Sequence, residues 1–75
     1  MKGAFDVSIK SHGNGVRLRL DARGQKKLAA DEGTIVLVSV PSGDIYRGIV
    51  AGNAIEIEDA TAAGFESPLR IRRLP

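Results

Sequence analysis

Residues 13–22 read Gly-Asn-Gly-Val-Arg-Leu-Arg-Leu-Asp-Ala, a glycine-asparagine turn followed by a strand in which apolar and charged residues alternate. The chain repeats this arrangement once, because residues 52–60 read Gly-Asn-Ala-Ile-Glu-Ile-Glu-Asp-Ala. Gly and Asn tolerate the positive φ angles of tight hairpin turns, and alternation with a period of two places apolar side chains on one face of a strand. The sequence therefore predicts two hairpins, one bearing arginine and the other bearing glutamate on the outer face.

Further strands surround these hairpins. Residues 5–10 alternate Phe, Val and Ile with polar side chains, which predicts a half-buried strand. Residues 34–40 form a nearly continuous apolar run rich in β-branched side chains, and we expect this strand to be the most buried. The Pro-Ser-Gly-Asp sequence at 41–44 predicts a tight turn into a strand at 45–51, and a last strand is expected at 69–73.

Two short helical segments are expected between the strands. The carboxylate of Asp21 can cap a helix within residues 22–31, because it can accept the free N–H groups of the first turn. Leu28 is its main apolar contact, and Gly33 suits its C-terminal stop. Residues 60–64 are predicted to form one helical turn.

The order of these elements predicts a mainly β fold in one domain over residues 1–75. Residues 4–40 and 44–74 each read as a ββαβ unit, so the chain looks like a pseudo-repeat. One such unit cannot cover its own apolar face, whereas two can close into a six-stranded barrel. The alternative is an open sheet made of two unrelated meanders.

Residues 7–40 resemble the swapped-hairpin DNA-binding domain of the AbrB/MazE family. The matching features are a basic first strand (Lys10), the Gly-Asn turn at 13–14, Leu-Arg-Leu at 18–20, Ala22 opening a helix, and Leu28 near its end. The resemblance implies a DNA-binding regulator or antitoxin-like protein in which Arg19 contacts DNA.

The chain departs from that family pattern in three respects. The usual Pro before the helix is Asp21, and the aromatic residue that often precedes Gly-Asn is His12. Family domains usually carry one ββαβ unit and dimerise to complete the barrel. The second unit predicted here would let one chain close the barrel alone, as in the wider cradle-loop, double-psi-like barrels.

The composition argues against catalysis, metal binding and membrane insertion. The chain has no Cys and a single His, His12, without companions at an informative spacing, and no P-loop pattern is present. Glu56, Glu58 and Asp59 are expected to be surface acids rather than a cation site. No apolar run is long enough to span a membrane and no signal-peptide core is visible, so we expect a cytoplasmic protein that is not an enzyme and uses no cofactor or metal.

The net charge of +2 is unevenly distributed. Residues 1–30 hold seven bases against two acids, residues 31–67 hold one base against seven acids, and residues 68–75 hold three bases. Clustered bases favour a polyanionic partner. The residues predicted to bind nucleic acid are Lys10, Arg17, Arg19, Arg23, Lys26 and Lys27.

Aromatic side chains are scarce, so we expect double-stranded DNA rather than stacked single-stranded bases. Two alternatives remain open. The chain could be a protein-interaction or assembly module that forms homo-oligomers through opposed basic and acidic faces. The basic residues could also be solvated charges paired with Asp6, Asp21 or the acidic half of the chain.

Overall fold

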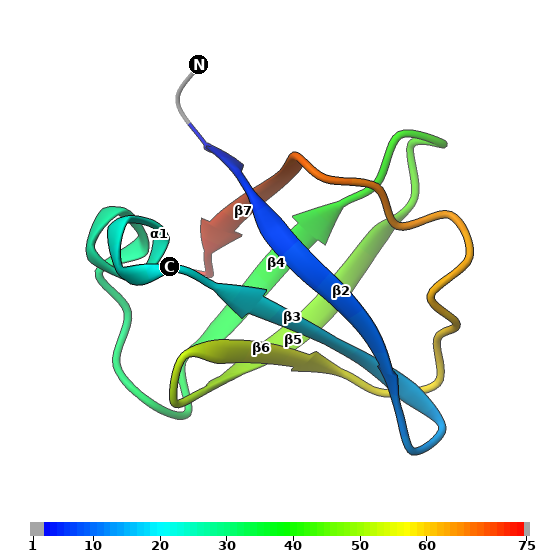
Figure 1. Ribbon diagram of the computed structural model, residues 1–75, viewed down its shortest axis with the longest axis horizontal. Helices are drawn as coiled ribbons and strands as arrows, with labels where there is room; N and C mark the ends of the chain where they lie inside the picture. The colour runs from blue at the N-terminus through cyan, green and yellow to red at the C-terminus, as the bar shows by residue number, and fades with distance from the viewer. Residues whose placement is uncertain (1–2, 75) are drawn as a thin grey trace.

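Antiparallel strands wrap into one nearly closed, barrel-shaped sheet in the computed structural model, which describes residues 3–74 (Figure 1). The strands are β1 Ala4–Phe5, β2 Val7–His12, β3 Gly15–Leu20, β4 Ile35–Ser39, β5 Ile45–Ala51, β6 Ala54–Ile57 and β7 Leu69–Arg73, and the helix α1 is Ala22–Leu28. The order across the sheet is β1-β7-β4-β5-β6-β3-β2. Because only Asp6 separates β1 from β2, the N-terminal segment lies at both ends of the sheet and brings them together.

The mainly β barrel predicted from sequence is confirmed in outline, with two corrections. The sheet has seven strands rather than six, because the first predicted strand breaks at Asp6, where the segment changes its partner from β7 to β3. Two ββαβ units are not shown, since residues 60–64 contain a bend at Ala62 and a turn at 63–64 instead of a helix. That segment is too short to compensate for the cost of starting a helix, and it leads into Phe65, whose ring packs 5.0 Å from that of Tyr46.

The core consists mainly of aliphatic side chains, which are joined by Phe5 and Phe65. On β3, Val16, Leu18 and Leu20 are buried, as the alternation predicts, and they meet Ile55 and Ile57 from β6. Exclusion of this much apolar surface from water is the main favourable contribution to folding.

Strand β4 is less buried than its sequence predicts. Val36 and Val38 point into the core and are fully buried, but Ile35 and Leu37 on the other face are only half-buried. A nearly continuous apolar run is typical of strands covered on both faces. This barrel has a single core, so the second face of β4 lies on the outside.

Both Gly-Asn turns form as predicted, and Gly15 shows a different requirement for glycine. Gly13 and Gly52 have φ angles of 61° and 63°, in the left-handed region. Gly15 lies where β3 passes close to β6, and a Cβ atom there would overlap the carbonyl oxygen of Ile57. The glycine at this position allows two backbones to approach each other.

Helix α1 begins where predicted and ends earlier. Asp21 is its N-cap, and its Oδ1 accepts the N–H of Gly24 at 2.7 Å. Leu28 is buried at the end of the helix, and Ala29 ends it in the left-handed conformation. The predicted stop at Gly33 is wrong: Gly33 lies in the turn before β4, where its N–H donates to the Val50 carbonyl at 2.8 Å.

Candidate nucleic-acid interface

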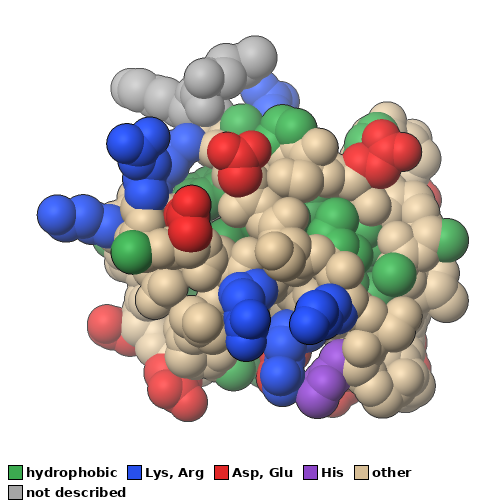
Figure 2. Space-filling model, in the orientation of Figure 1, with side chains coloured by type: hydrophobic (Ala, Val, Ile, Leu, Met, Phe, Trp, Pro, Cys, Tyr) green, Lys and Arg blue, Asp and Glu red, His purple; other side chains and the backbone are tan. Residues whose placement is uncertain are grey.

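The β2–β3 hairpin brings three of the predicted basic residues together on its outer face. Lys10 lies directly opposite Arg17 across the two strands, and Arg19 lies two residues further along β3, opposite Ser8. Figure 2 shows Lys and Arg side chains gathered beside the chain's one His side chain. The turn of this hairpin projects from the barrel (Figure 1). We call Lys10, Arg17 and Arg19 the hairpin cluster.

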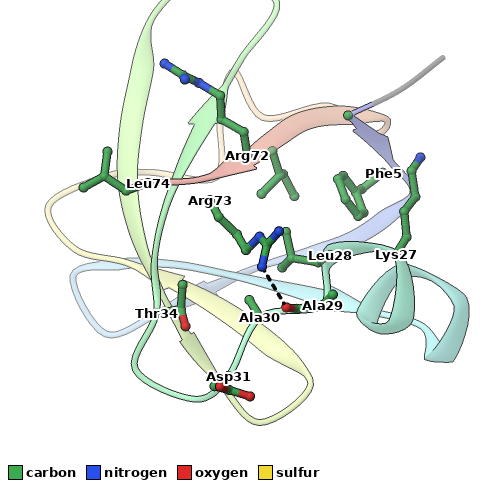
Figure 3. Close-up of a pocket in the computed structure, with 12 residues that line it drawn as sticks. Phe5, Lys27, Leu28, Ala29, Ala30, Asp31, Thr34, Arg72, Arg73 and Leu74 are labelled. Carbon is green, nitrogen blue, oxygen red and sulfur yellow. Dashed lines mark hydrogen bonds between the residues drawn. The ribbon is translucent and has the colours of Figure 1, made fainter.

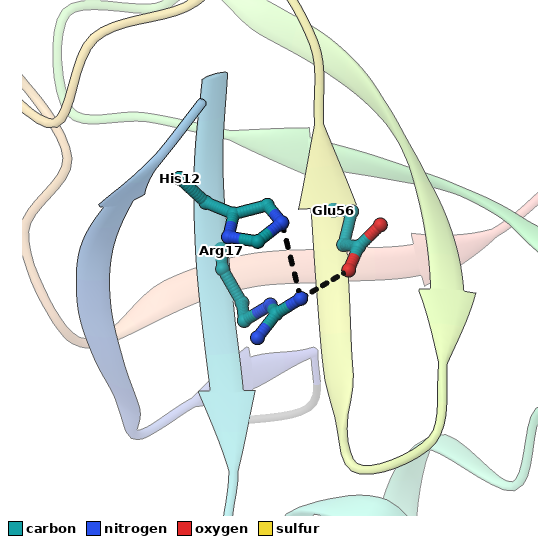
Figure 4. Close-up of polar contacts among 3 residues, drawn as sticks. All are labelled: His12, Arg17 and Glu56. Carbon is teal, nitrogen blue, oxygen red and sulfur yellow. Dashed lines mark hydrogen bonds and ion pairs between the residues drawn. The ribbon is translucent and has the colours of Figure 1, made fainter. Parts of the chain in front are cut away.

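Arg17 is held by two neighbours within the molecule (Figure 4). Its Nη2 donates to Glu56 Oε2 at 2.7 Å and to His12 Nε2 at 3.1 Å. Since a guanidinium can only donate, the Nε2 atom of His12 accepts this bond. Arg17 and Glu56 are both about half-exposed, and Arg17 Nε is buried without a hydrogen-bond partner within the described residues.

The contact between Arg17 and Glu56 explains why the two hairpins carry opposite charges. Strand β3 pairs with β6, and the register places Arg17 opposite Glu56. Cross-strand pairs of opposite charge stabilise a sheet, whereas like charges in these positions would repel. The two hairpins are therefore neighbours, and at this pair the basic and acidic faces meet instead of lying on opposed sides of the molecule.

The three predicted basic residues of α1 are placed differently from one another. Arg23 and Lys26 are exposed on the helix surface. Lys27 Nζ donates to the Ala4 carbonyl at 2.6 Å and lies 4.7 Å from the centroid of the Phe5 ring. Lys27 thus fastens the helix to β1, and its side chain stays exposed.

Acidic side chains interrupt the basic surface between the hairpin and the helix. Asp6 and Asp21 line a shallow hollow of about 250 Å³ together with Arg19. The carboxylate of Asp21 is occupied by the helix cap. Of the basic residues predicted to bind nucleic acid, the hairpin cluster forms one group, and Arg23 and Lys26 form a second across this gap.

A larger cavity of about 790 Å³, which the sequence did not predict, lies between α1 and β7 (Figure 3). Its wall includes Phe5 and Leu28 together with Lys27, Arg72 and Arg73. Arg73 Nη1 donates to the Ala29 carbonyl at 3.2 Å, and in Figure 3 Arg72 points away from Arg73. The charges therefore do not converge on one point. No sequence motif marks this cavity, because its walls come from segments far apart in the chain.

The described residues contain no recognisable metal centre or membrane span. Among residues 3–74 no three His, Cys, Asp or Glu side chains are grouped so that they could hold a metal ion. In the same part of the chain, no helix has the length and apolarity to cross a membrane.

The chain matches no protein-family model, no curated protein and no solved structure. The resemblance of residues 7–40 to AbrB/MazE domains therefore stays a prediction. The fold and the positions of the side chains are the basis for a functional proposal.

Proposed function

We propose that this barrel binds double-stranded DNA through the β2–β3 hairpin, as a non-enzymatic regulator or antitoxin-like protein of the cytoplasm. The observation that carries the proposal is the placement of Lys10, Arg17 and Arg19 on one outward face of a projecting hairpin. Arg23 and Lys26 on α1 extend the basic surface. Cations arranged in this way can meet successive phosphates and release their counterions.

The shape of the hairpin favours a duplex over a single strand. A two-stranded β-ribbon fits the major groove of B-form DNA. Single strands are usually held by aromatic side chains on which bases stack. Here Phe5 and Phe65 are buried, and Tyr46 is half-buried and packs against the core. In residues 3–74 the hairpin cluster has no Phe, Tyr or Trp side chain beside it to act as a stacking platform.

The contact between Arg17 and Glu56 limits the strength of such binding. Of the six predicted residues, it leaves Lys10, Arg19, Arg23 and Lys26 without a hydrogen bond or ion pair to another described residue, since Lys27 is bonded to the Ala4 carbonyl. Each phosphate neutralised contributes about −0.9 to the slope of log K against log salt concentration, so four contacts give a slope of about −3.6. We expect weak binding with a moderate dependence on salt.

The first test measures the affinity of the protein for a fluorescently labelled duplex of about 20 base pairs by anisotropy, from about 50 to 200 mM salt. Arg19→Ala is expected to weaken binding about 3- to 10-fold at low salt and to reduce the salt slope by about one. The matched control is Arg47→Ala on β5, which removes the same charge from a strand outside the hairpin. Absence of binding at about 50 mM salt, or equal losses in both variants, would overturn the proposal.

Self-association is a second candidate function, favoured by the acidic side chains that remain exposed. Glu58, Asp59 and Glu66 lie on the loop between β6 and β7, and all three are exposed. A second copy could present its hairpin cluster to this loop and form a homo-oligomer. Light scattering at rising concentration tests this: mass should increase in the wild type and less in Glu58→Lys, while a constant monomer mass excludes the assembly.

A further inference from the structure

The outer face of β4, β5 and β7 forms a regular grid of side chains. Strand β4 lies in the middle, with β5 on one side and β7 on the other. The registers pair Leu37 with Arg47 and with Arg72, so these three side chains form the central row. A second row joins Arg70, Ser39 and Ile45. A third row runs from Leu74, whose N–H donates to the Ile35 carbonyl at 3.0 Å, through Ile35 to Ile49. We call these nine residues the outer grid.

The outer grid gathers the exposed apolar side chains of the described molecule. Between residues 3 and 74, the large hydrophobic side chains that are exposed are Ile45, Ile49 and Leu74, at 61%, 46% and 41%. All three belong to the outer grid, and the half-buried Ile35 and Leu37 lie between them. Single apolar side chains on a surface are ordinary, whereas a contiguous apolar patch marks an interaction site.

The charges of the outer grid are all positive. Arg47 and Arg72 flank Leu37 and are exposed, and neither has a hydrogen-bond or ion-pair partner within the described residues. None of the nine residues is acidic, and Glu56, which lies next to Ile49 on β6, is paired with Arg17. Because the patch combines an aliphatic stripe with arginines on both sides, we propose that it binds an amphipathic helix of a partner protein, with an aliphatic stripe flanked by Asp or Glu.

The dimensions of the outer grid fit one helix. Neighbouring strands are about 4.8 Å apart, so Arg47 and Arg72 rise from backbones separated by about 10 Å. An α-helix with its side chains is about 10 to 12 Å wide. A helix lying along β4 therefore places its apolar stripe on Ile35 and Leu37, and its two flanks above the arginines. The four-residue step from Ile45 to Ile49 spans about 13 Å, which corresponds to more than two helical turns.

Other occupants fit this surface less well. A second copy that docked through the same face would bring Arg47 and Arg72 against identical arginines, and such like charges repel across an interface. Nucleic-acid bases require flat, π-rich side chains for stacking, and the apolar members of the outer grid are all aliphatic. An acidic helix satisfies both the apolar and the charged parts of the surface.

A designed peptide tests this inference even while the natural partner is unidentified. The probe is a synthetic helix of about 18 residues with a leucine stripe flanked by glutamate, and the control peptide carries lysine in place of every glutamate. We expect the glutamate peptide to bind at least about tenfold more tightly. In titrations followed by amide NMR, the largest shifts should lie in β4, β5 and β7.

Variants locate the contact and separate it from DNA binding. Arg47→Glu combined with Arg72→Glu should weaken peptide binding about tenfold or more, whereas Arg23→Glu on α1 should change it less than about twofold. Arg47→Glu should leave the Arg19-dependent binding of DNA intact, so the two proposals can fail independently.

Four outcomes would overturn the inference. They are absence of binding at about 1 mM glutamate peptide, equal binding of both peptides, shifts confined to the hairpin cluster, and a dimer whose interface buries Ile45 and Ile49. The amide spectrum of each variant shows whether it is folded. If the double variant is unfolded, Ile49→Asp supplies a second test, because it removes an exposed apolar contact and places a carboxylate against the glutamate peptide, and the side chain at this position contributes little to the core.

Discussion

Glu56 controls how much of the positive charge of Arg17 reaches solvent. Its carboxylate lies 2.7 Å from the guanidinium, and both side chains are about half-exposed. Half-exposed ion pairs contribute only about 0 to 1 kcal/mol to stability, so the pair affects binding more than folding. Glu56 is thus the residue whose removal should strengthen the proposed DNA contact.

We predict that Glu56→Gln increases affinity for duplex DNA about 2- to 10-fold at low salt, because it removes a negative charge and leaves Arg17 unneutralised. Anisotropy titration measures the change, and urea denaturation should show a loss of stability below about 1 kcal/mol. Glu66→Gln is the matched control, since it removes an exposed acid from the loop between β6 and β7. If Glu56→Gln leaves DNA binding unchanged or weakens it, Arg17 does not contact the phosphates of the DNA.

At this scale the sequence predicted which residues face outward but not which of them touch. The alternation in residues 16–20 correctly placed Arg17 and Arg19 on the surface. The partner of Arg17 is Glu56, 39 positions away in the sequence, and this contact depends on the pairing of β3 with β6. Register between distant strands is set by the closure of the whole sheet, and local patterning does not contain that information.

The stability of helix α1 depends more on its N-cap, Asp21, than on its length. It has seven residues, which is too few to be stable alone in water. The bond from Gly24 N–H to Asp21 Oδ1 and the burial of Leu28 hold it on the barrel. The helix in turn positions Arg23 and Lys26.

We predict that Asp21→Ala lowers the free energy of unfolding by about 1 kcal/mol, because the first turn loses its acceptor. Asp21→Ser keeps an N-cap oxygen and should recover most of that stability. Thermal and urea denaturation compare the three proteins. A loss in the serine variant equal to that in the alanine variant would show that the charge of Asp21, rather than the cap, matters.

The sequence predicted the positions of strands, turns and the helix better than it predicted which of their faces are buried. Strands, hairpin turns and the N-cap of α1 follow from local rules, and each was located from the sequence. The sequence did not predict the outer grid, because β5 carries apolar side chains on both of its faces. Tyr46 and Val50 face inward, and Ile45 and Ile49 face outward. The signal that could have found it is Arg47, whose position in the alternation matches that of the two isoleucines.

The whole molecule is small, so its core tolerates little loss. A domain of 75 residues has a stability of about 4 to 11 kcal/mol. Leu18 and Ile55 are fully buried and belong to the paired strands β3 and β6. Loss of one large core side chain therefore removes a large fraction of the total free energy of unfolding.

We predict that Leu18→Ala destabilises the protein by about 3 to 5 kcal/mol, through lost burial and the cavity left behind. Ile45→Ala is the matched control: it removes a similar side chain from the outer grid and should change stability by less than about 0.5 kcal/mol. Urea denaturation measures both. Equal losses would mean that Ile45 belongs to the packed core, which would also remove it from the proposed docking surface.

The N-terminal segment pairs with β7 through β1 and with β3 through β2, so the barrel has one seam. Val7 N–H also donates to Ser67 Oγ at 3.0 Å across this seam. Release of this single segment would expose the edges of β3 and β7 at the same moment, although they belong to opposite halves of the chain. We therefore expect local opening at the two ends of the sequence to be coupled, so that detachment of β2, which bears Lys10, also loosens β7, which bears Arg72.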